Sequence, residues 1–596
     1  MKTQILKRSD GKQGFGPGRA VRSLLCGVVS VASLVGANSW AQLPESATID
    51  PAAIEEAGLP ETAAEKTELT VEVLKQLSAD TQSLLVNAAE TVVSIDGGSG
   101  VIVSEDGWVM TASHVCGRPG RQVQVRLANG LVWPARTFGA DRQNDTGMLK
   151  LLGDHVWPFA QVKSQAIVEP GDWCVVMGYP WDTESLKAPA VRLGRVTAVS
   201  EDRIVTDVPI IGGDSGGPVF GVNGDLLAIN SRIRLDVNQN IHVPVATFVR
   251  QLDALRRAKF VRATGVRKNE TIDDSLPRQF GRNAAEVGSA VADLIAKAEE
   301  SVVGLVSVKR GQNQDKPLPE VLGTIVTESG LVVAKQSELR LPVKARVDGD
   351  WVEAEVVAFD RATDLSLLQL KPKADRKFVP LQVDEDAEEE LVGRLIFSLV
   401  KNSKEGPLAT SLGTIMVEPH SFTATVERQD VDLGVVLDTE VRRREKNGAR
   451  ISRVYPESLA AQLGLRNGDR LVSIHGSDVV DETSLNQVLA KLTGGQRIRF
   501  SIRRQGELLS FRVVLPAKLP VVWDRWGGGP FSGRRFGFGT VIAHDGVIAP
   551  SDCGGPVIDL NGKFIGINVS RAMRTTTFVV PATAVKALVQ RYQQGQ

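Results

Sequence analysis

Most of the chain alternates between short apolar runs and polar turns. Runs rich in Val and Ile, such as GVIVSEDGWVMTA (100–112) and GTIVTESGLVVAK (323–335), are separated by Gly, Asp and Asn. Short alternating segments punctuated by turn residues are typical of antiparallel strands, and many in succession favour closed barrels with solid cores. The pattern therefore predicts a mainly β protein, and 596 residues are enough for several domains.

The apolar pattern occurs twice along the chain. The two copies share the strings GSGVIVSEDG and GTIVTESG, then NDTGMLKL and ATDLSLLQL, then GGDSGGPVF and SDCGGPVI. The aligned pairs are Gly100 with Gly323, Asp145 with Asp364, Gly194 with Gly413, and Ser215 with Cys553. The last two pairs lie 21 residues apart in the first copy and 140 apart in the second, which indicates an insertion of 119 residues. The chain thus contains a duplicated domain with a third domain inserted late in the second copy.

Three strings in the first copy carry chemistry. They are TASH (111–114), Asn144-Asp145 and GDSGGP (213–218). A serine hydroxyl is a weak nucleophile that needs a base, and the base needs a group that holds its tautomer. His114, Asp145 and Ser215 supply these three groups. Glycines around the serine let the backbone bend so that the N–H groups of Gly213 and Ser215 face one developing oxyanion.

These strings resemble the trypsin-like serine proteases, and more closely the HtrA/Deg family of exported quality-control proteases, over about residues 80–250. The resemblance implies two trypsin-like double β-barrel domains. It also implies that His114 is the general base, that Asp145 orients it and that Ser215 attacks the substrate carbonyl. Unfolded or damaged polypeptides are the implied substrates. Whether the chain forms a homo-oligomer, as family members commonly do, is left open.

Two departures from the family pattern concern the nucleophile loop. Asp214 stands where the closer family has Asn. Pro209 stands six residues before Ser215, where a trypsin that cleaves after Lys or Arg needs Asp. Ile210, Ile211 and Ile229 suggest a small apolar pocket instead, which predicts cleavage after Val, Ala, Ile or similar residues.

The second copy lacks most of this chemistry. Its His position is Ser337, its nucleophile position is Cys553, and Ser551 replaces the oxyanion glycine, while Asp364 is retained. Thiolate chemistry needs a base or a cationic neighbour that lowers the thiol pKa, and none stands at the aligned positions. The second copy is therefore predicted to be a pseudoprotease, with a cysteine protease as the alternative.

The insertion contains GARISRVYPESLAAQLGLRNGDRLVSIHGSDV (448–479) and resembles a PDZ domain over residues 428–516. The resemblance implies that backbone N–H groups at Leu433 and Gly434 capture a peptide C-terminus and that the strand from Val435 pairs with the peptide. A PDZ domain that packs without binding peptide is the alternative. The stretch WDRWGGGPFSGRRFGFG (523–539) is rich in Gly and aromatic residues and is interpreted as a flexible return linker.

The N-terminus is typical of an export signal. Basic residues are followed by an uncharged stretch from Ser23 to Pro44, with small residues at Ser39 and Ala41 before a cleavage site. An uncleaved membrane anchor is the alternative. Cleavage after Ala41 leaves a net charge of −5 and a periplasmic or secreted protein. This charge gives no support to nucleic-acid binding. The scattered His residues show no metal-ligand spacing, so neither a metal nor a cofactor is expected.

The sequence predicts an exported serine endopeptidase engaged in protein quality control. The alternative function is a peptide-binding scaffold, a pseudoprotease plus PDZ, without significant proteolysis. The predicted segments are a signal peptide (1–41), an N-terminal segment (42–79), a protease domain (80–261), a linker (262–290), a degenerate protease domain (291–420 and 536–596), the PDZ domain (428–516) and a Gly- and aromatic-rich linker (517–535).

Overall fold

The computed structural model describes residues 68–595 except for 164–166, 181–187, 262–280, 310–315, 318–319, 340, 373–375, 382–389, 402–407, 422–432, 439–447, 456–457, 490, 493–495 and 516–525. The predicted signal peptide and most of the N-terminal segment lie outside the described residues. Within the described residues, no helix combines the length and the apolar character that crossing a membrane requires.

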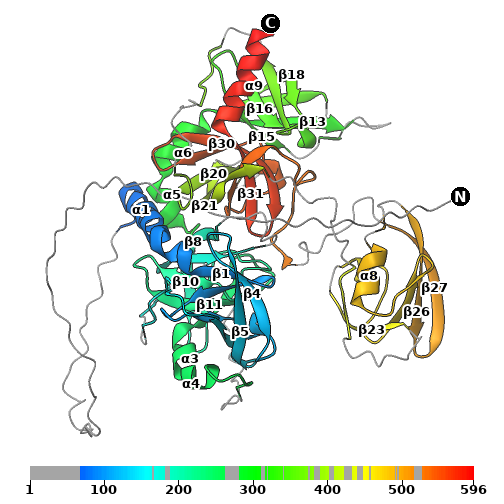
Figure 1. Ribbon diagram of the computed structural model, residues 1–596. Coiled ribbons are helices and arrows are strands. Elements are labelled where there is room, and N and C mark those ends of the chain that lie inside the picture. The colour runs from blue at the N-terminus through cyan, green and yellow to red at the C-terminus, as the bar shows by residue number, and fades with distance from the viewer. Residues whose placement is uncertain are drawn as a thin grey trace, which may run out of the picture. The chain divides into compact units, whose positions relative to one another are not determined.

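The first copy, hereafter copy one, consists of two closed six-stranded barrels (Figure 1). The strand order is β1-β2-β3-β6-β5-β4 in the first barrel and β10-β11-β12-β9-β8-β7 in the second. The strands of copy one other than β5 carry buried Val, Ile, Leu or Met side chains that fill the barrel interiors, and β5 contributes the buried Ala135, Thr137 and Ala140. The strands are β1 (Val92–Ile95), β2 (Gly98–Ile102), β3 (Trp108–Thr111), β4 (Gln122–Arg126), β5 (Val132–Asp141), β6 (Thr146–Leu151), β7 (Trp173–Gly178), β8 (Ala190–Val199), β9 (Ile204–Thr206), β10 (Pro218–Gly221), β11 (Leu226–Ile233) and β12 (Asn240–Pro244).

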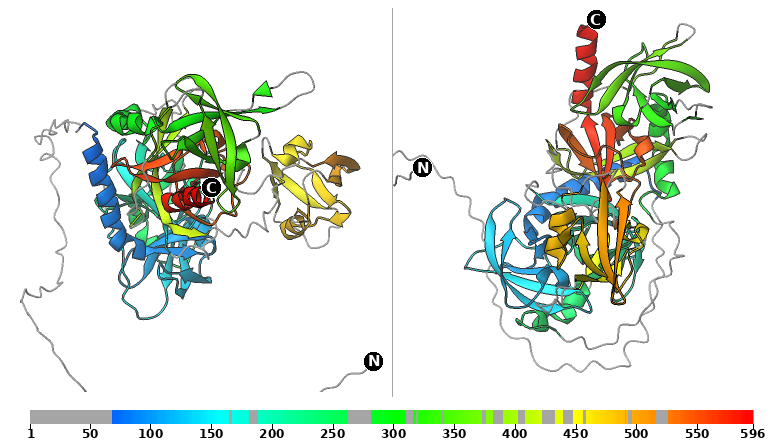
Figure 2. Two further views of the ribbon diagram at one scale, coloured as in Figure 1. Left: turned by 90° about the horizontal axis from the view of Figure 1, so that it is seen from above. Right: turned by 90° about the vertical axis from the view of Figure 1, so that its right-hand side faces the viewer.

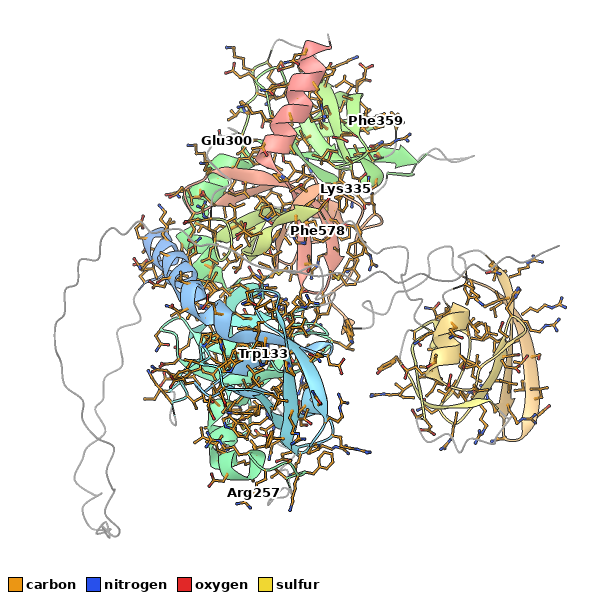
Figure 3. The ribbon with its side chains drawn as sticks, viewed as in Figure 1. Trp133, Arg257, Glu300, Lys335, Phe359 and Phe578 are labelled. Atoms are coloured by element: carbon orange, nitrogen blue, oxygen red, sulfur yellow. The ribbon has the colours of Figure 1, made fainter. Side chains whose placement is uncertain are left out.

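The second copy, hereafter copy two, repeats this plan. Its first sheet has the order β14-β13-β15-β16-β19-β18-β17, and pairing of β13 with β17 joins its ends, while its second barrel has the order β20-β21-β28-β31-β30-β29. The strands are β13 (Val302–Lys309), β14 (Lys316–Pro317), β15 (Val321–Ile325), β16 (Leu331–Lys335), β17 (Val343–Val347), β18 (Asp350–Asp360), β19 (Leu365–Lys371), β20 (Leu395–Lys401), β21 (Leu408–Ser421), β28 (Thr540–His544), β29 (Pro556–Asp559), β30 (Phe564–Met573) and β31 (Thr576–Pro581). Phe578, labelled in Figure 3, is fully buried inside the second barrel. The predicted duplication of a double-barrel domain is confirmed.

The inserted domain leaves and re-enters copy two at one point of a sheet. Ser421 at the end of β21 pairs with Thr540 at the start of β28, so the insertion occupies the end of a hairpin. In the views of Figure 2, yellow-green β20 and β21 lie beside the orange and red strands that follow the insertion. Adjacent chain ends of this kind let a domain be inserted without disturbing the host barrel.

The inserted domain has its own hydrophobic core. Its strand order is β22-β23-β24-β26-β27, with β25 paired to β24, so β22 forms an edge of the sheet. The elements are β22 (Val435–Leu437), β23 (Ala449–Val454), α7 (Leu459–Gln462), β24 (Arg470–Ile474), β25 (Ser477–Asp478), α8 (Glu482–Leu489), β26 (Arg497–Arg504) and β27 (Glu507–Val514).

The two copies share a core. One hydrophobic cluster contains residues of both second barrels, and the backbone N–H of Leu193 on β8 donates to Thr414 Oγ1 on β21 over 3.2 Å. Helix α1 crosses the expected boundary at residue 80, and its Ser78 Oγ accepts the backbone N–H of Leu395 in copy two. The helices of the two copies are α1 (Val71–Ala88), α2 (Ser113–Cys116), α3 (Val245–Arg250), α4 (Leu252–Leu255), α5 (Ala285–Ala290), α6 (Ala292–Glu299) and α9 (Ala582–Gln594).

The return linker is not flexible from Trp526 onward, which corrects the sequence interpretation. Ser532 is fully buried and Phe538 is almost fully buried. Trp526 and Phe536 pack against the core shared by the two copies. The Gly-rich composition suggested flexibility, whereas the glycines here allow close packing of backbone against backbone.

Candidate active site

His114 and Asp145 are held together by two turns of the first barrel. His114 lies in the short helix α2, directly after β3, and Asp145 lies in the turn between β5 and β6 with φ of +57°. His114 Nδ1 is 2.9 Å from Asp145 Oδ1 and 3.0 Å from Oδ2. Asp145 is buried, whereas half of the His114 side chain is exposed. The carboxylate therefore fixes one ring nitrogen and leaves the other side of the imidazole open.

Asp145 accepts three further hydrogen bonds. They come from Ser113 Oγ (3.0 Å), Ser231 Oγ (2.6 Å) and the His114 backbone N–H (3.3 Å). Burial alone would raise the pKa of Asp145, but the hydrogen bonds from His114 and the serines, with the nearby imidazole, hold it below its usual value. Asp145 therefore stays ionised beside the imidazole.

Ser231 was missed by the sequence analysis. It lies on β11, in the second barrel, and reaches across to an aspartate in the first barrel. The aligned residue in copy two is Val569, which cannot donate this bond, so comparison of the two copies contains the signal.

Ser215 lies on a loop between β9 and β10 that packs against the first barrel. Its carbonyl accepts the Ser99 backbone N–H over 2.8 Å. Gly216 has φ of +87°, and a Cβ there would collide with the Ser99 carbonyl and the Thr111 hydroxyl. Glycine therefore lets the nucleophile loop approach the strand that leads into His114. Among the described residues no hydrogen bond joins Ser215 Oγ to His114, and such bonds are often long before substrate binds.

The backbone at Gly213 and Ser215 leaves two N–H groups available. Gly213 has φ of +99°. The Asp214 N–H donates to Ile211 O and the Gly216 N–H to Asn230 O, but within the described chain the amides of Gly213 and Ser215 donate to nothing. Two free amides on either side of one residue can hold an oxyanion.

Asp214 is anchored by an arginine that the sequence analysis did not identify. Its Oδ2 lies 3.0 Å from Arg192 Nη1 and accepts the Ile211 N–H over 2.9 Å, and neither charged side chain is accessible. Burial raises the pKa of Asp214, while the Arg192 charge opposes that effect. Loss of one partner of a buried pair is strongly destabilising. Arg192 on β8 therefore explains how Asp can replace Asn here.

Comparison with known proteins identifies these domains. The model of the trypsin-like peptidase domain matches residues 98–229, and the model of the PDZ domain matches residues 450–504. DegP-like periplasmic serine endoproteases of Marinomonas sp. (22% identity, 71% of this chain, 79% of the relative) and Halomonas elongata (25%, 70% and 78%) are similar. The chain therefore contains a trypsin-like peptidase domain and a PDZ domain and is similar to DegP-like serine endoproteases. It is a serine-type endopeptidase.

Among solved structures, the match to a serine endoprotease from Yersinia pestis covers 73% of this chain and 97% of that structure's chain, at 14% identity and a TM-score of 0.27.

The isoleucines expected to line a specificity pocket of this endopeptidase are buried in its cores. Ile210 packs in one hydrophobic cluster, and Ile211 and Ile229 pack in another. The predicted preference for apolar residues stays a prediction.

Copy two retains the aspartate turn of the copy-one site but has neither its histidine nor its serine nucleophile. Asp364 has φ of +58°, and its Oδ2 accepts the hydroxyl of Ser337 over 2.7 Å. Arg534 Nη1 lies 3.7 Å from Asp364 Oδ1, so an arginine of the return segment faces the carboxylate. A cavity of about 450 Å³ opens beside these three residues.

Cys553 is fully buried under the return segment. Its Sγ lies 3.6 Å from Ser532 Oγ, and Ser532 exchanges hydrogen bonds with the backbone of Arg571 on β30, both 3.0 Å long. Burial raises the pKa of Cys553 against the opposing charge of Lys335, which is labelled in Figure 3. The Cys553 N–H donates to the Pro550 carbonyl and is not available to an oxyanion. The thiol is therefore covered, protonated and without an oxyanion site.

The PDZ residues named from sequence lie at the sheet edge. The Leu433 carbonyl accepts the Ala460 N–H over 2.8 Å, and the Gly434 carbonyl accepts the Tyr455 N–H over 3.0 Å. Gly434 has φ of +72°, and a Cβ there would collide with Ser458. Val435 begins the edge strand β22. These bonds fix the loop conformation next to an open edge.

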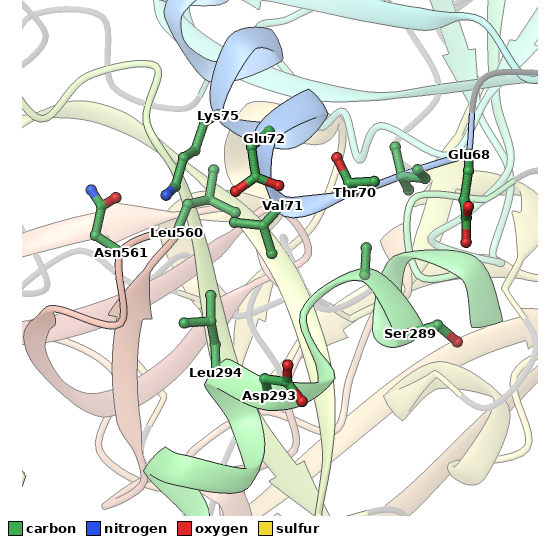
Figure 4. A pocket seen from close by; sticks show the side chains of 12 residues that line it. Glu68, Thr70, Val71, Glu72, Lys75, Ser289, Asp293, Leu294, Leu560 and Asn561 are labelled. Atoms are coloured by element: carbon green, nitrogen blue, oxygen red, sulfur yellow. The ribbon is translucent and has the colours of Figure 1, made fainter.

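A further cavity, of about 620 Å³, is shown in Figure 4. It lies between the start of α1, the junction of α5 and α6, and the turn after β29, and its lining includes none of His114, Asp145 and Ser215. It is therefore separate from the candidate active site.

Proposed function

We propose that this protein is a periplasmic endopeptidase that cleaves unfolded or damaged polypeptides with the triad of His114, Asp145 and Ser215 in copy one. The observation that carries the proposal is the imidazole of His114, which is bonded through Nδ1 to the buried, ionised Asp145 and is open on its other side. A histidine held in this way has the tautomer and the orientation of a general base.

The proposed reaction uses these groups in sequence. Ser215 Oγ attacks the carbonyl carbon while its proton passes to His114 Nε2, and Asp145 stabilises the imidazolium that forms. The N–H groups of Gly213 and Ser215 bind the oxyanion. His114 then gives its proton to the leaving amine. A water molecule, deprotonated by the same imidazole, releases the acyl group from Ser215.

The PDZ domain is proposed to bind peptide C-termini. The amides around Leu433 and Gly434 would receive the carboxylate, and the peptide would extend the sheet beside Val435 on the edge strand β22. Relatives named as periplasmic enzymes support a location in the periplasm. N-terminal sequencing of the mature protein tests the export signal, because cleavage after Ala41 leaves Gln42 as the first residue.

Digestion of casein by the full chain tests the proposal. Substitution Ser215→Ala should lower turnover by on the order of 10³ or more, because the triad acts as a unit. A fluorophosphonate should label Ser215 and no other residue. Absence of digestion by the wild type would favour the peptide-binding scaffold. Undiminished digestion by Ser215→Ala would contradict the triad.

A further inference from the structure

One arginine of copy two extends into copy one with every donor used. Arg574 follows β30 and is fully buried. Its Nε donates to Ile210 O (3.1 Å), Nη1 to Leu235 O (3.2 Å) and Trp526 O (2.6 Å), and Nη2 to Asp236 O (2.9 Å) and Asn240 Oδ1 (3.1 Å). A guanidinium has five N–H donors, and here five acceptors receive them.

Three of the acceptors lie in two loops of copy one, namely the loop that carries the proposed nucleophile and the turn after β11, while Asn240 begins β12 and Trp526 belongs to the return segment. Ile210 begins the segment that leads through Gly213 to Ser215. Leu235 and Asp236 lie in the turn after β11, the strand whose Ser231 bonds to Asp145. Asn240 Oδ1 also accepts the Ile210 N–H over 3.4 Å. Arg574 therefore ties the nucleophile loop to the β11–β12 turn.

Trp526 supports the same loop from the return segment. A Cβ placed on Gly212 would lie 2.7 Å from the Trp526 indole, so the ring lies directly against the residue before Gly213. Arg574 Nη1 fixes the Trp526 carbonyl. The indole of Trp526 therefore packs against Gly212, and the guanidinium of Arg574 binds the Ile210 carbonyl. Both side chains come from outside copy one.

We propose that copy two is a positioning element for catalysis in copy one, because Arg574 and Trp526 hold residues 210–213 so that the amides of Gly213 and Ser215 face the substrate carbonyl. This inference rests on the proposed function of Ser215. Removing one oxyanion donor outright costs about 10²–10³ in kcat, so a loosened loop should cost somewhat less. Lys offers three donors from a single point and cannot reproduce five fixed bonds.

The test compares Arg574→Gln, Arg574→Lys and Trp526→Leu in the full chain with a matched control. Arg282→Gln is the control, because Arg282 is also buried and its side chain joins the copies through Asp545 and Leu193 O, whereas it donates no hydrogen bond to residues 210–213. The measurements are kcat and KM on a short fluorogenic peptide, the rate of fluorophosphonate labelling, and the thermal unfolding midpoint Tm.

Arg574→Gln and Trp526→Leu should lower kcat and the labelling rate by about 10- to 100-fold with little change in KM. The kcat and the labelling rate of Arg574→Lys should lie between those of these two variants and those of the wild type. Arg282→Gln should lower Tm without this loss of kcat. If Arg574→Gln does not fold, Trp526→Leu decides, because Trp526 is only half-buried.

Wild-type kcat in folded Arg574→Gln or in Trp526→Leu would overturn the inference. An equal loss of kcat in Arg282→Gln at equal Tm would overturn it too, because the effect would then be general destabilisation. These results differ from failure of the proposed function, in which Ser215→Ala would remain active.

Discussion

The two copies have the same backbone frame but different chemistry. Asp145 and Asp364 have φ of +57° and +58°, and each accepts the backbone N–H of the residue at the base position. In copy one that residue is His114, and in copy two it is Ser337. The positive φ of both aspartates, uncommon outside glycine, shows that the two copies share this turn although only copy one has a histidine there. The comparison thus distinguishes the residues that form the barrel turn from the residues proposed to carry out the reaction.

The nucleophile loops differ in a second way. Gly213 has φ of +99°, and the Ser215 amide donates to nothing in the described chain. At the aligned place in copy two, Pro550–Asp552 form a 3-10 turn in which the Cys553 N–H donates to Pro550 O. Ser551 does not adopt the positive φ that glycine allows. Restoring a serine and a histidine would therefore not by itself restore an oxyanion site.

The largest expected difference between the copies concerns their aspartates. Asp145→Asn should lower kcat by about 10³–10⁴, because the amide favours the wrong imidazole tautomer. Asp364→Asn should leave kcat unchanged, because within the described residues the Asp364 carboxylate accepts hydrogen bonds from Ser337 alone and faces Arg534. Steady-state kinetics of both variants, with circular dichroism as the control for folding, measure this contrast. A comparable loss in Asp364→Asn would contradict it.

The sequence was sufficient to predict the features that local spacing and internal repetition determine. The barrels, the insertion and the three strings around His114, Asp145 and Ser215 follow from such patterns. Arg192 and Arg574 did not, because their partners Asp214 and Ile210 lie far away in the sequence and only the fold brings them together. An arginine among 70 basic residues carries no mark of burial. The sequence also could not show that the return segment is packed, because glycines suit both a flexible chain and a closely packed one.

A smaller effect is expected from pH through a buried histidine. His242 Nδ1 lies 2.9 Å from Asn230 Oδ1, and Asn230 Nδ2 donates to Asp214 O over 3.1 Å. Burial lowers the pKa of His242 to about 3. The unfolded chain then binds a proton below its usual pKa of about 6.5 that the folded chain rejects, so stability is lost as pH falls from there towards 3. The loss should reach roughly 2–4 kcal/mol.

Urea unfolding between pH 7 and 4 measures this dependence. His242→Gln should be less stable than the wild type at pH 7 but should lose less stability on acidification. In copy two His544 bonds to Asn568 in the same manner, and burial lowers its pKa to about 4. His544→Gln should flatten the pH dependence as well. It should lower kcat less than His242→Gln does, because His544 lies in copy two, outside the proposed active site. An unchanged pH dependence in His242→Gln would contradict the assignment.

A still smaller effect is expected in the PDZ domain. Gly434→Ala places a methyl group against Ser458 and should lower affinity for a C-terminal peptide by about tenfold, the equivalent of ~1.4 kcal/mol. Gly464→Ala is the matched control, because Gly464 also has positive φ, of +75°, but has open space around it. Fluorescence polarisation with a labelled peptide bearing a free apolar C-terminus, beside its amide, measures binding. Equal binding by both variants would count against a carboxylate site at Gly434.

The last prediction is that Cys553 contributes nothing to proteolysis. Its thiol is fully buried beneath Ser532, burial raises its pKa, and its aligned base, Ser337, bonds to Asp364 instead. Only a small thiolate fraction would exist at pH 7, with no acid to protonate the leaving amine. Cys553→Ala should therefore fold and retain full turnover on casein. Iodoacetamide should modify Cys553 much more slowly in the folded chain than in urea. Loss of peptidase activity in folded Cys553→Ala, judged by circular dichroism, would reveal a second active site and overturn the contrast between the two copies.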